Sequence, residues 1–117
     1  MGEPETLLRR LALSDERLIG EILDHATNAE LSGLDAKTHA LARVAADVAL
    51  NASAASYQCS VNAAFAAGAT DEEVVGVLVA AAPEIGMANV VSLAPTFAAA
   101  IGYDVEAAFE TGDVTQS

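Results

Sequence analysis

The most constraining feature of the chain is a complete helix-start signal at Thr70. Glu73 stands three residues after Thr70, so the Thr hydroxyl can accept from the amide of Glu73 while the Glu carboxylate accepts from the amide of Thr70. The residues that follow are mostly apolar as far as Pro83 and Gly86. We therefore predict a helix that begins at Asp71 and is ended by Pro83 and Gly86.

Both sides of this predicted helix are apolar. The residues expected on its inner face are Val74, Val75, Leu78, Ala81, Ala82 and Ile85. Val77 and Val79 make the opposite side apolar as well. A helix that is apolar all round needs cover on its second side, and we expect another subunit to supply that cover.

Helix boundaries recur along the rest of the chain, whereas the alternation typical of strands is almost absent. We predict that Ser14 caps a helical region ended by Ser32 and Gly33, and that Asp35 caps the next helix. Asn51 or Ser53 should open a third helix, which Gly68 closes. After the helix that begins at Asp71, we predict a helix from Asn89 to Ile101 that is kinked or restarted at Pro95 and closed by Gly102, and a short last helix from its cap Asp104 through Phe109. Residues 111–117 read as a frayed tail. The pattern predicts an all-α fold of about six helices.

The length of 117 residues predicts a single domain, 1–117, with one core. Hydrophobic residues make up 53% of the chain, yet only three Phe and two Tyr are present and Ala is abundant. Small side chains favour close packing of helices. The core of one copy would be thin, so we expect the protein to form a homo-oligomer.

The formal net charge of −12 comes from 17 acidic and five basic residues. This charge repels phosphate backbones and anionic lipid headgroups, so we expect neither a nucleic-acid partner nor a membrane partner. No apolar run approaches the length of a membrane span, and the charged start predicts no signal peptide. The single cysteine allows no intrachain disulfide, and we expect a cytoplasmic location.

Four short segments, 34–38, 56–73, 82–86 and 101–103, together resemble a known family. The most specific of them is a helix that ends in Gly-Ala-Thr and is followed by the acidic capping box. Over roughly residues 30–110 the chain is similar to short members of the carboxymuconolactone decarboxylase and alkylhydroperoxidase D family. This resemblance implies an all-helical alkylhydroperoxidase D-like fold, assembly into trimers or hexamers, and a small-molecule pocket near the subunit interface.

The family's usual catalytic groups are replaced in this chain. Its peroxidase branch carries two cysteines three apart, a following histidine and an upstream glutamate, whereas this helix has Cys59 alone. Its decarboxylase branch carries a glutamate and a histidine one turn apart, and counting back from Gly68 places Ser56 and Ser60 there. The resemblance thus implies a carboxy-lyase acting on a small lactone acid, or a peroxidase, with Cys59, Ser56 and Ser60 as candidate catalytic residues.

Cys59 has two interpretations. A lone cysteine among small apolar residues of a helix is most often a buried hydrophobe, and this is the interpretation we favour. A peroxidatic thiol would need a cation or a base to form its thiolate, and the candidates are Arg43 and His39. We expect His39 to be packed and neutral near a helix start. Arg43 could form an anion pocket or an ion pair with Asp47 or with a carboxylate of a neighbouring subunit.

Ser56, Tyr57 and Ser60 are candidate ligand-binding residues, because Ser56 and Ser60 share a helix face and the resemblance places that face on the pocket. The alternative is that the serines bond to backbone carbonyls and Tyr57 packs at an interface. The spacing of the two histidines and the cysteine predicts no metal site, and no cofactor is predicted. Two classes of function stay open, namely an enzyme of the family type and a non-catalytic oligomer that binds a small molecule or a pathway partner.

Overall fold

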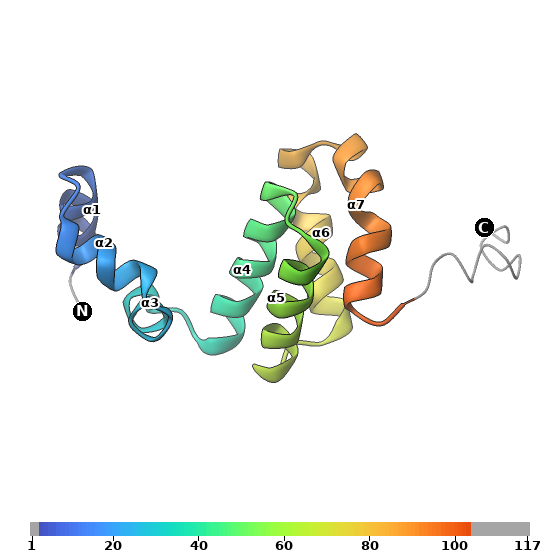
Figure 1. Cartoon of the computed structure of the whole chain (residues 1–117), viewed down its shortest axis with the longest axis horizontal. Coiled ribbons are helices and arrows are strands. Elements are labelled where there is room, and N and C mark those ends of the chain that lie inside the picture. The colour runs from blue at the N-terminus through green and yellow to red at the C-terminus, as the bar shows by residue number, and fades with distance from the viewer. Residues whose placement is uncertain (1–2, 104–117) are drawn as a thin grey trace, which may run out of the picture. The chain divides into compact units, whose positions relative to one another are not determined.

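The computed structural model describes residues 3–103, and the regular structure within this range is helical throughout (Figure 1). The seven helices of this range are α1 (Pro4–Ala12), α2 (Glu16–Leu23), α3 (His25–Ser32), α4 (Ala36–Leu50), α5 (Ala54–Ala66), α6 (Asp71–Ile85) and α7 (Met87–Ala100). The predicted all-α class is confirmed. The count exceeds the expected six because the part of the chain before Gly33 forms more helices than its pattern indicated. The predicted helix from Asp104 to Phe109 lies outside the described residues.

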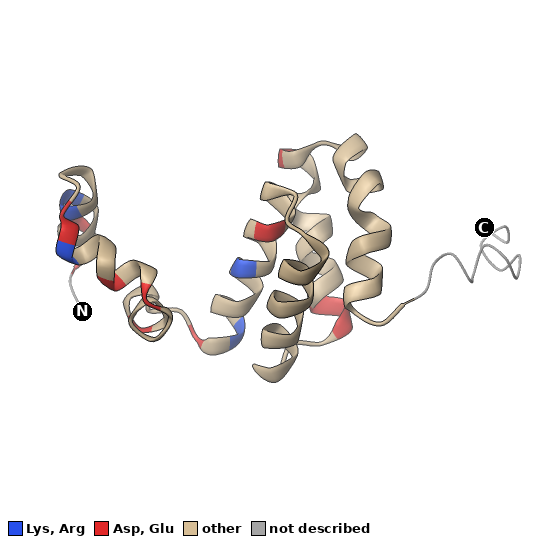
Figure 2. Ribbon diagram, viewed as in Figure 1, with Lys and Arg blue, Asp and Glu red and all other residues tan. Residues whose placement is uncertain are grey.

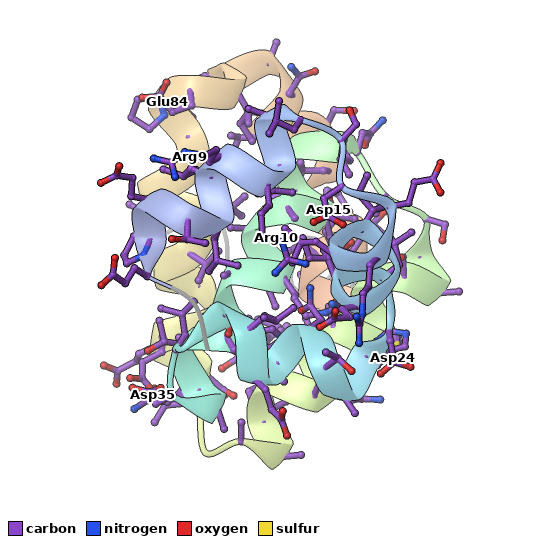
Figure 3. All side chains as sticks on the ribbon, turned by 90° about the vertical axis from the view of Figure 1, so that its left-hand side faces the viewer. Arg9, Arg10, Asp15, Asp24, Asp35 and Glu84 are labelled. Carbon is purple, nitrogen blue, oxygen red and sulfur yellow. The ribbon has the colours of Figure 1, made fainter. Side chains whose placement is uncertain are left out.

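The chain divides into two compact units, Met1–His39 and Ala40–Ser117. In the first unit Asp15, rather than the predicted Ser14, caps α2. The Asp15 carboxylate accepts from the amides of Arg17 and Leu18, while Ser14 has a φ of 56°. The Arg10 guanidinium also donates to Asp15 at 2.8 Å (Figure 3). Hydrogen bonds from these donors are stronger to a charged carboxylate than to a hydroxyl, which explains why the cap lies one residue later than predicted.

The region predicted as one helix up to Ser32 is divided at Asp24. The Asp24 carboxylate accepts from the amide of Thr27 and thereby caps α3 as a separate helix. This hydrogen bond lowers the pKa of Asp24 below its ordinary value. Gly33 ends α3 in the left-handed region at φ 66°, as predicted.

The helices from α4 onward confirm most of the predicted helix boundaries. Asp35 accepts from the amide of Thr38 at 2.8 Å at the start of α4. Of the two residues predicted to open α5, Ser53 is the cap. Gly68, which follows α5, has a φ of 96°, a conformation that glycine adopts without strain.

The capping box of α6 is formed as predicted. The Glu73 amide donates to the Thr70 hydroxyl at 3.1 Å, and the Thr70 amide donates to the Glu73 carboxylate at 2.9 Å. Pro83 was expected to help end this helix, but α6 continues through it to Ile85 and is closed by Gly86. Because Pro83 lies in the last turn, its missing N–H removes one hydrogen bond near the helix end, where the loss is tolerated.

The inner face of α6 differs slightly from the predicted one. Val74 is fully buried, and Val77, Leu78, Ala81 and Ile85 are partly buried against the core. Val75 is 38% exposed, so its assignment to the inner face was wrong. The observed set follows the spacing of a single helical face, which places Val75 at its edge.

The core of the second unit lies between α4, α5, α6 and α7, which stand side by side in Figure 1. Its buried side chains include Val44, Val48, Tyr57, Val61, Ala64, Val74, Leu93 and Phe97. The α7 helix includes Pro95 without restarting and contacts both α5 and α6. Within the described range, no helix is both long enough and apolar enough to span a bilayer.

Candidate functional site

The fold brings two polar side chains together, Asp47 of α4 and Ser60 of α5. The Ser60 hydroxyl donates to the Asp47 carboxylate at 2.5 Å. One of the alternatives for Arg43, an ion pair with Asp47, is absent among the ion pairs of residues 3–103, and Arg43 is exposed. Asp47 is only partly exposed, and its hydrogen-bond donor is the Ser60 hydroxyl of the neighbouring helix. The sequence analysis did not identify Asp47 as a site residue, because the pairing joins two helices.

Tyr57 faces the core. Its side chain is 1% exposed, and its ring meets the ring of Phe97 edge to face, with centroids 5.9 Å apart. The buried Tyr57 hydroxyl has no hydrogen-bond partner among the described residues. Burial raises the pKa of Tyr57, and the negative charge of Asp47 raises it further. The hydroxyl therefore stays protonated at neutral pH and can act as a donor but not as a base.

Cys59 is exposed, so the prediction of a buried cysteine was wrong. The buried residues of α5 are Tyr57, Val61 and Ala64, which follow one another at helical spacing. Cys59 lies two positions after Tyr57, about 200° around the helix, and therefore points away from the core. Ser56 is partly buried, and its amide donates to the capping hydroxyl of Ser53.

His39 belongs to the first unit, where its ring is partly exposed. Its Nδ1 atom shares a hydrogen bond with the Ser32 hydroxyl, at 3.0 Å. Among the candidate site residues, Ser60 is therefore bonded to Asp47, Tyr57 is buried, and Cys59 and Arg43 are exposed to solvent. This arrangement does not bring the candidate thiol together with a base.

A hollow of about 350 Å³ lies between α5 and α7. It is lined by Ala54, Gln58, Pro95, Thr96, Ala99 and Ala100. The Gln58 amide group donates to the side chain of Asn62 at 3.0 Å and to the carbonyl of Ala100 at 3.1 Å. Its own carbonyl oxygen has no partner among the described residues. The signal that could have revealed this hollow is the pair of polar residues, Gln58 and Thr96, among small apolar ones.

A second hollow, of about 530 Å³, runs along the outer side of α6. Its lining residues are Asp71, Glu72, Val75, Gly76, Val79, Ala80 and Tyr103. The Tyr103 hydroxyl donates to the Asp71 carboxylate at 3.0 Å, and this bond raises the pKa of Tyr103. Figure 2 shows acidic residues at the start of α6, so one end of this hollow is negatively charged.

Comparisons with family models, with curated proteins and with solved structures found no match to the chain.

Proposed function

We propose that the chain is a non-catalytic helical protein that binds a small uncharged molecule and assembles into a homo-oligomer. The observation that carries this proposal is the hollow between α5 and α7. Its volume of about 350 Å³ lies within the range of ligand pockets, roughly 300 to 1,000 Å³. All of its lining side chains are uncharged.

The lining also indicates the chemistry of the ligand. Ala54, Pro95 and Ala99 give apolar contact surface, the Gln58 carbonyl oxygen can accept a hydrogen bond, and the Thr96 hydroxyl can donate or accept one. An amide or a hydroxyl on a small ring would satisfy both groups. A carboxylate would find no cation among these lining side chains. This chemistry favours a neutral ligand over the lactone acid that the family resemblance implies.

The state of the serines also supports a binding function over decarboxylation. Decarboxylation of a lactone acid needs a group that delivers or removes a proton at carbon. The Ser60 proton is engaged by Asp47, and a serine hydroxyl does not titrate near neutral pH. The raised pKa of Tyr57 keeps that hydroxyl protonated as well. We therefore expect no turnover of carboxymuconolactone.

A peroxidase of the family type is the second candidate, because the exposed position of Cys59 would allow a peroxide to reach the thiol. In such a reaction the thiolate attacks one peroxide oxygen, the O–O bond breaks, and the other oxygen leaves and takes up a proton to give an alcohol or water. Dithiothreitol then reduces the resulting sulfenic acid to the thiol and is itself oxidised to its disulfide, with release of water. The test measures peroxide consumption with dithiothreitol for the wild type and for Cys59→Ser. We expect equal background rates, whereas a rate that the variant abolishes would support the peroxidase.

The ligand proposal can be tested by nuclear magnetic resonance on the full chain of 11.9 kDa. Benzamide and phenol serve as neutral probes and benzoate as the anionic one. We expect the neutral probes to shift the amide signals of Gln58, Thr96 and Ala100, and benzoate to leave them unchanged. Shifts caused by benzoate alone, or by no probe, would contradict the proposal.

Two matched variants sharpen this test. Ala99→Leu places a larger side chain in the hollow, while Ala88→Leu makes the same change at an exposed position of α7 that does not line the hollow. We expect Ala99→Leu to abolish the shifts and Ala88→Leu to preserve them. Equal effects of the two variants would show that the probes bind elsewhere.

For assembly, we propose that a second copy covers the face of α7 that carries Met87 and Val91. These side chains lie one turn apart and are 62% and 67% exposed. Light scattering at micromolar concentration should give the mass of a trimer or a hexamer, and Val91→Asp should lower it. A stable wild-type mass of 11.9 kDa, that of one chain, would refute assembly without affecting the ligand proposal.

A further inference from the structure

The first compact unit, Met1–His39, has very little core of its own. Leu18 of α2 is the one buried residue of its helices α1, α2 and α3. A unit of about this size gains most of its stability from the apolar area that it buries, and association with a second surface is a common way to increase that area. The exposed apolar side chains of this unit are therefore candidates for an interface.

An exposed apolar strip runs along the length of α1. It consists of Pro4, Leu8, Leu11 and Ala12, which are all exposed. Leu8 lies at its centre and is 66% exposed, and Leu11 is 43% exposed. The spacing of four and three residues from Pro4 to Leu8 to Leu11 is that of the seam along which two helices pack side by side. We propose that α1 of one copy of the chain packs on α1 of a second copy, antiparallel, with the two Leu8 side chains at the centre.

The charges beside this strip are complementary to those of a second copy. Glu5 and Arg9 lie one turn apart on the same side of Leu8, and their side chains pair at 2.9 Å while staying mostly in solvent. In an antiparallel pair of α1 helices, Glu5 of each copy faces Arg9 of the other, so that all four charges have opposite neighbours. A parallel pair would place like charges together. The charges therefore select the antiparallel arrangement, while the leucines supply most of the buried apolar area.

One register satisfies the leucines and the charges together. The midpoint between Glu5 and Arg9 is Leu7, which lies one residue from Leu8, or about 1.5 Å along the helix axis. The long side chains of Glu5 and Arg9 bridge an offset of this size. Packing centred on Leu8 therefore also brings the charged side chains of the two copies within reach of each other.

The balance of charge also favours a second copy over another partner. Residues 4–23 carry three arginines and four carboxylates, so this stretch is almost neutral although the chain as a whole has a charge of −12. Two copies can therefore approach each other here with little repulsion. A partner surface of a single sign would instead be repelled by either Glu5 or Arg9. This contact lies on a different helix from the assembly surface proposed on α7, so the two can be tested separately.

The first experiment measures mass by light scattering on the full chain with Val91→Asp, which removes the contact proposed on α7. We expect the mass of two chains. Adding Leu8→Asp should halve this mass, whereas adding Leu23→Asp, at an exposed leucine of α2, should leave it unchanged. A mass of one chain before either change, or the same effect of both changes, would overturn the proposal. Failure of the α7 contact alone would leave wild type and Val91→Asp with equal masses and would not alter these expectations.

The second experiment exchanges charges between the two copies. In the same background, Glu5→Arg alone and Arg9→Glu alone each place like charges across the pair, and each should weaken pairing by about tenfold. An equal mixture of the two variants should recover it, because each introduced charge then faces an opposite one on the other copy. The like charges within each α1 persist in the mixture, so recovery reports only on contact between chains.

Arg17→Glu is the matched control for Arg9→Glu. It makes the same change of charge one turn before Glu21 on α2, away from the apolar strip, and should leave the mass unchanged. A mixture that does not recover the mass of two chains would overturn the antiparallel pair. An Arg17→Glu variant that pairs as weakly as Arg9→Glu would overturn it as well, because net charge rather than contact would then explain the loss.

Discussion

Removal of the Tyr57 hydroxyl is the most decisive stability test that the core offers, because the expected effect has an unusual sign. Most substitutions of buried residues destabilise a protein. The Tyr57 hydroxyl, however, is buried without a hydrogen-bond partner among the described residues, while in the unfolded chain it bonds to water. We therefore expect Tyr57→Phe to increase the free energy of unfolding.

The magnitude follows from two opposing contributions. An unsatisfied buried polar group costs about 1 to 3 kcal/mol. Removing the hydroxyl leaves a void of about 10 Å³, which costs about 0.2 kcal/mol at about 24 cal/mol per Å³. The ring itself and its contact with Phe97 are retained. The net gain should be about 1 kcal/mol, or about 4 °C in the melting temperature of a domain of this size.

The assay is thermal and urea unfolding at pH 7, with Tyr103→Phe as the matched control. The Tyr103 hydroxyl is exposed and donates to Asp71, so its removal should leave the free energy of unfolding nearly unchanged and should not raise it. A loss of about 1 kcal/mol or more in Tyr57→Phe would refute the reasoning. Such a loss would mean that the Tyr57 hydroxyl has a partner, such as a buried water.

Alkaline pH gives a second measurement on the same pair of variants. Burial raises the pKa of Tyr57 above its ordinary value of 10.0, so the folded state disfavours the phenolate. The contribution of Tyr57 to the free energy of unfolding is complete below pH 10 and is lost as the pH rises through the higher pKa of the folded state. Tyr57→Phe should reduce this alkaline loss. Equal alkaline loss in the wild type and in the variant would contradict burial as the cause.

Three further predictions follow from the caps and from the thiol. Thr70→Ala removes one half of the capping box and should lower the free energy of unfolding by about 1 kcal/mol in urea titrations; no change would contradict the role of the cap. The Arg10 guanidinium lowers the pKa of Asp15 below 3.8, so stability from Asp15 is present above pH 3.8 and lost as the pH falls through the lowered value. Asp15→Asn should therefore flatten acid denaturation, and an unchanged slope would contradict this. Native Cys59 should react with a disulfide reagent at a rate similar to that of a model thiol, and Cys59→Ser should melt unchanged, whereas protection from the reagent would indicate cover by another subunit.

Helix boundaries were the part of the fold that the sequence could predict best, because a cap is a local interaction. Thr70 with Glu73, Asp35 and Gly33 depend on residues within four positions of one another. The errors at Ser14 and Asp24 have the same local origin. At Ser14 the neighbouring carboxylate of Asp15 became the cap instead, and at Asp24 a carboxylate capped a separate helix inside the region that had been predicted as one.

The direction of α5 side chains could also have been predicted from the spacing of the large apolar residues. Tyr57, Val61 and Ala64 repeat at intervals of four and three residues and mark the inner face. The interpretation of Cys59 from its residue type alone placed its side chain on the wrong side of α5. The spacing of its larger neighbours is more informative than the usual burial of cysteine.

The partner of Asp47 could not be predicted from the sequence. Arg43 stands one turn before it on the same helix, which is the position that local rules favour for an ion pair. The contact that forms instead joins Asp47 to Ser60, 13 residues away on the next helix. Only the packing of α4 against α5 determines which of these two donors reaches the carboxylate.

This hydrogen bond also limits what Ser60 can do for any molecule that binds nearby. A serine hydroxyl has one proton and two lone pairs, and the proton is directed at Asp47. Ser60 can then accept a hydrogen bond from a ligand, but it can donate one only if its bond to a carboxylate is broken. Because hydrogen bonds to charged groups are the stronger ones, that exchange is unfavourable for a neutral acceptor.

The position that the family resemblance gives to a catalytic histidine is thus occupied here by a group that ties α4 to α5, and binding chemistry has to come from elsewhere on α5. Gln58, whose carbonyl oxygen faces no described partner and whose side chain lines the hollow beside α7, is the residue of that helix placed to provide it.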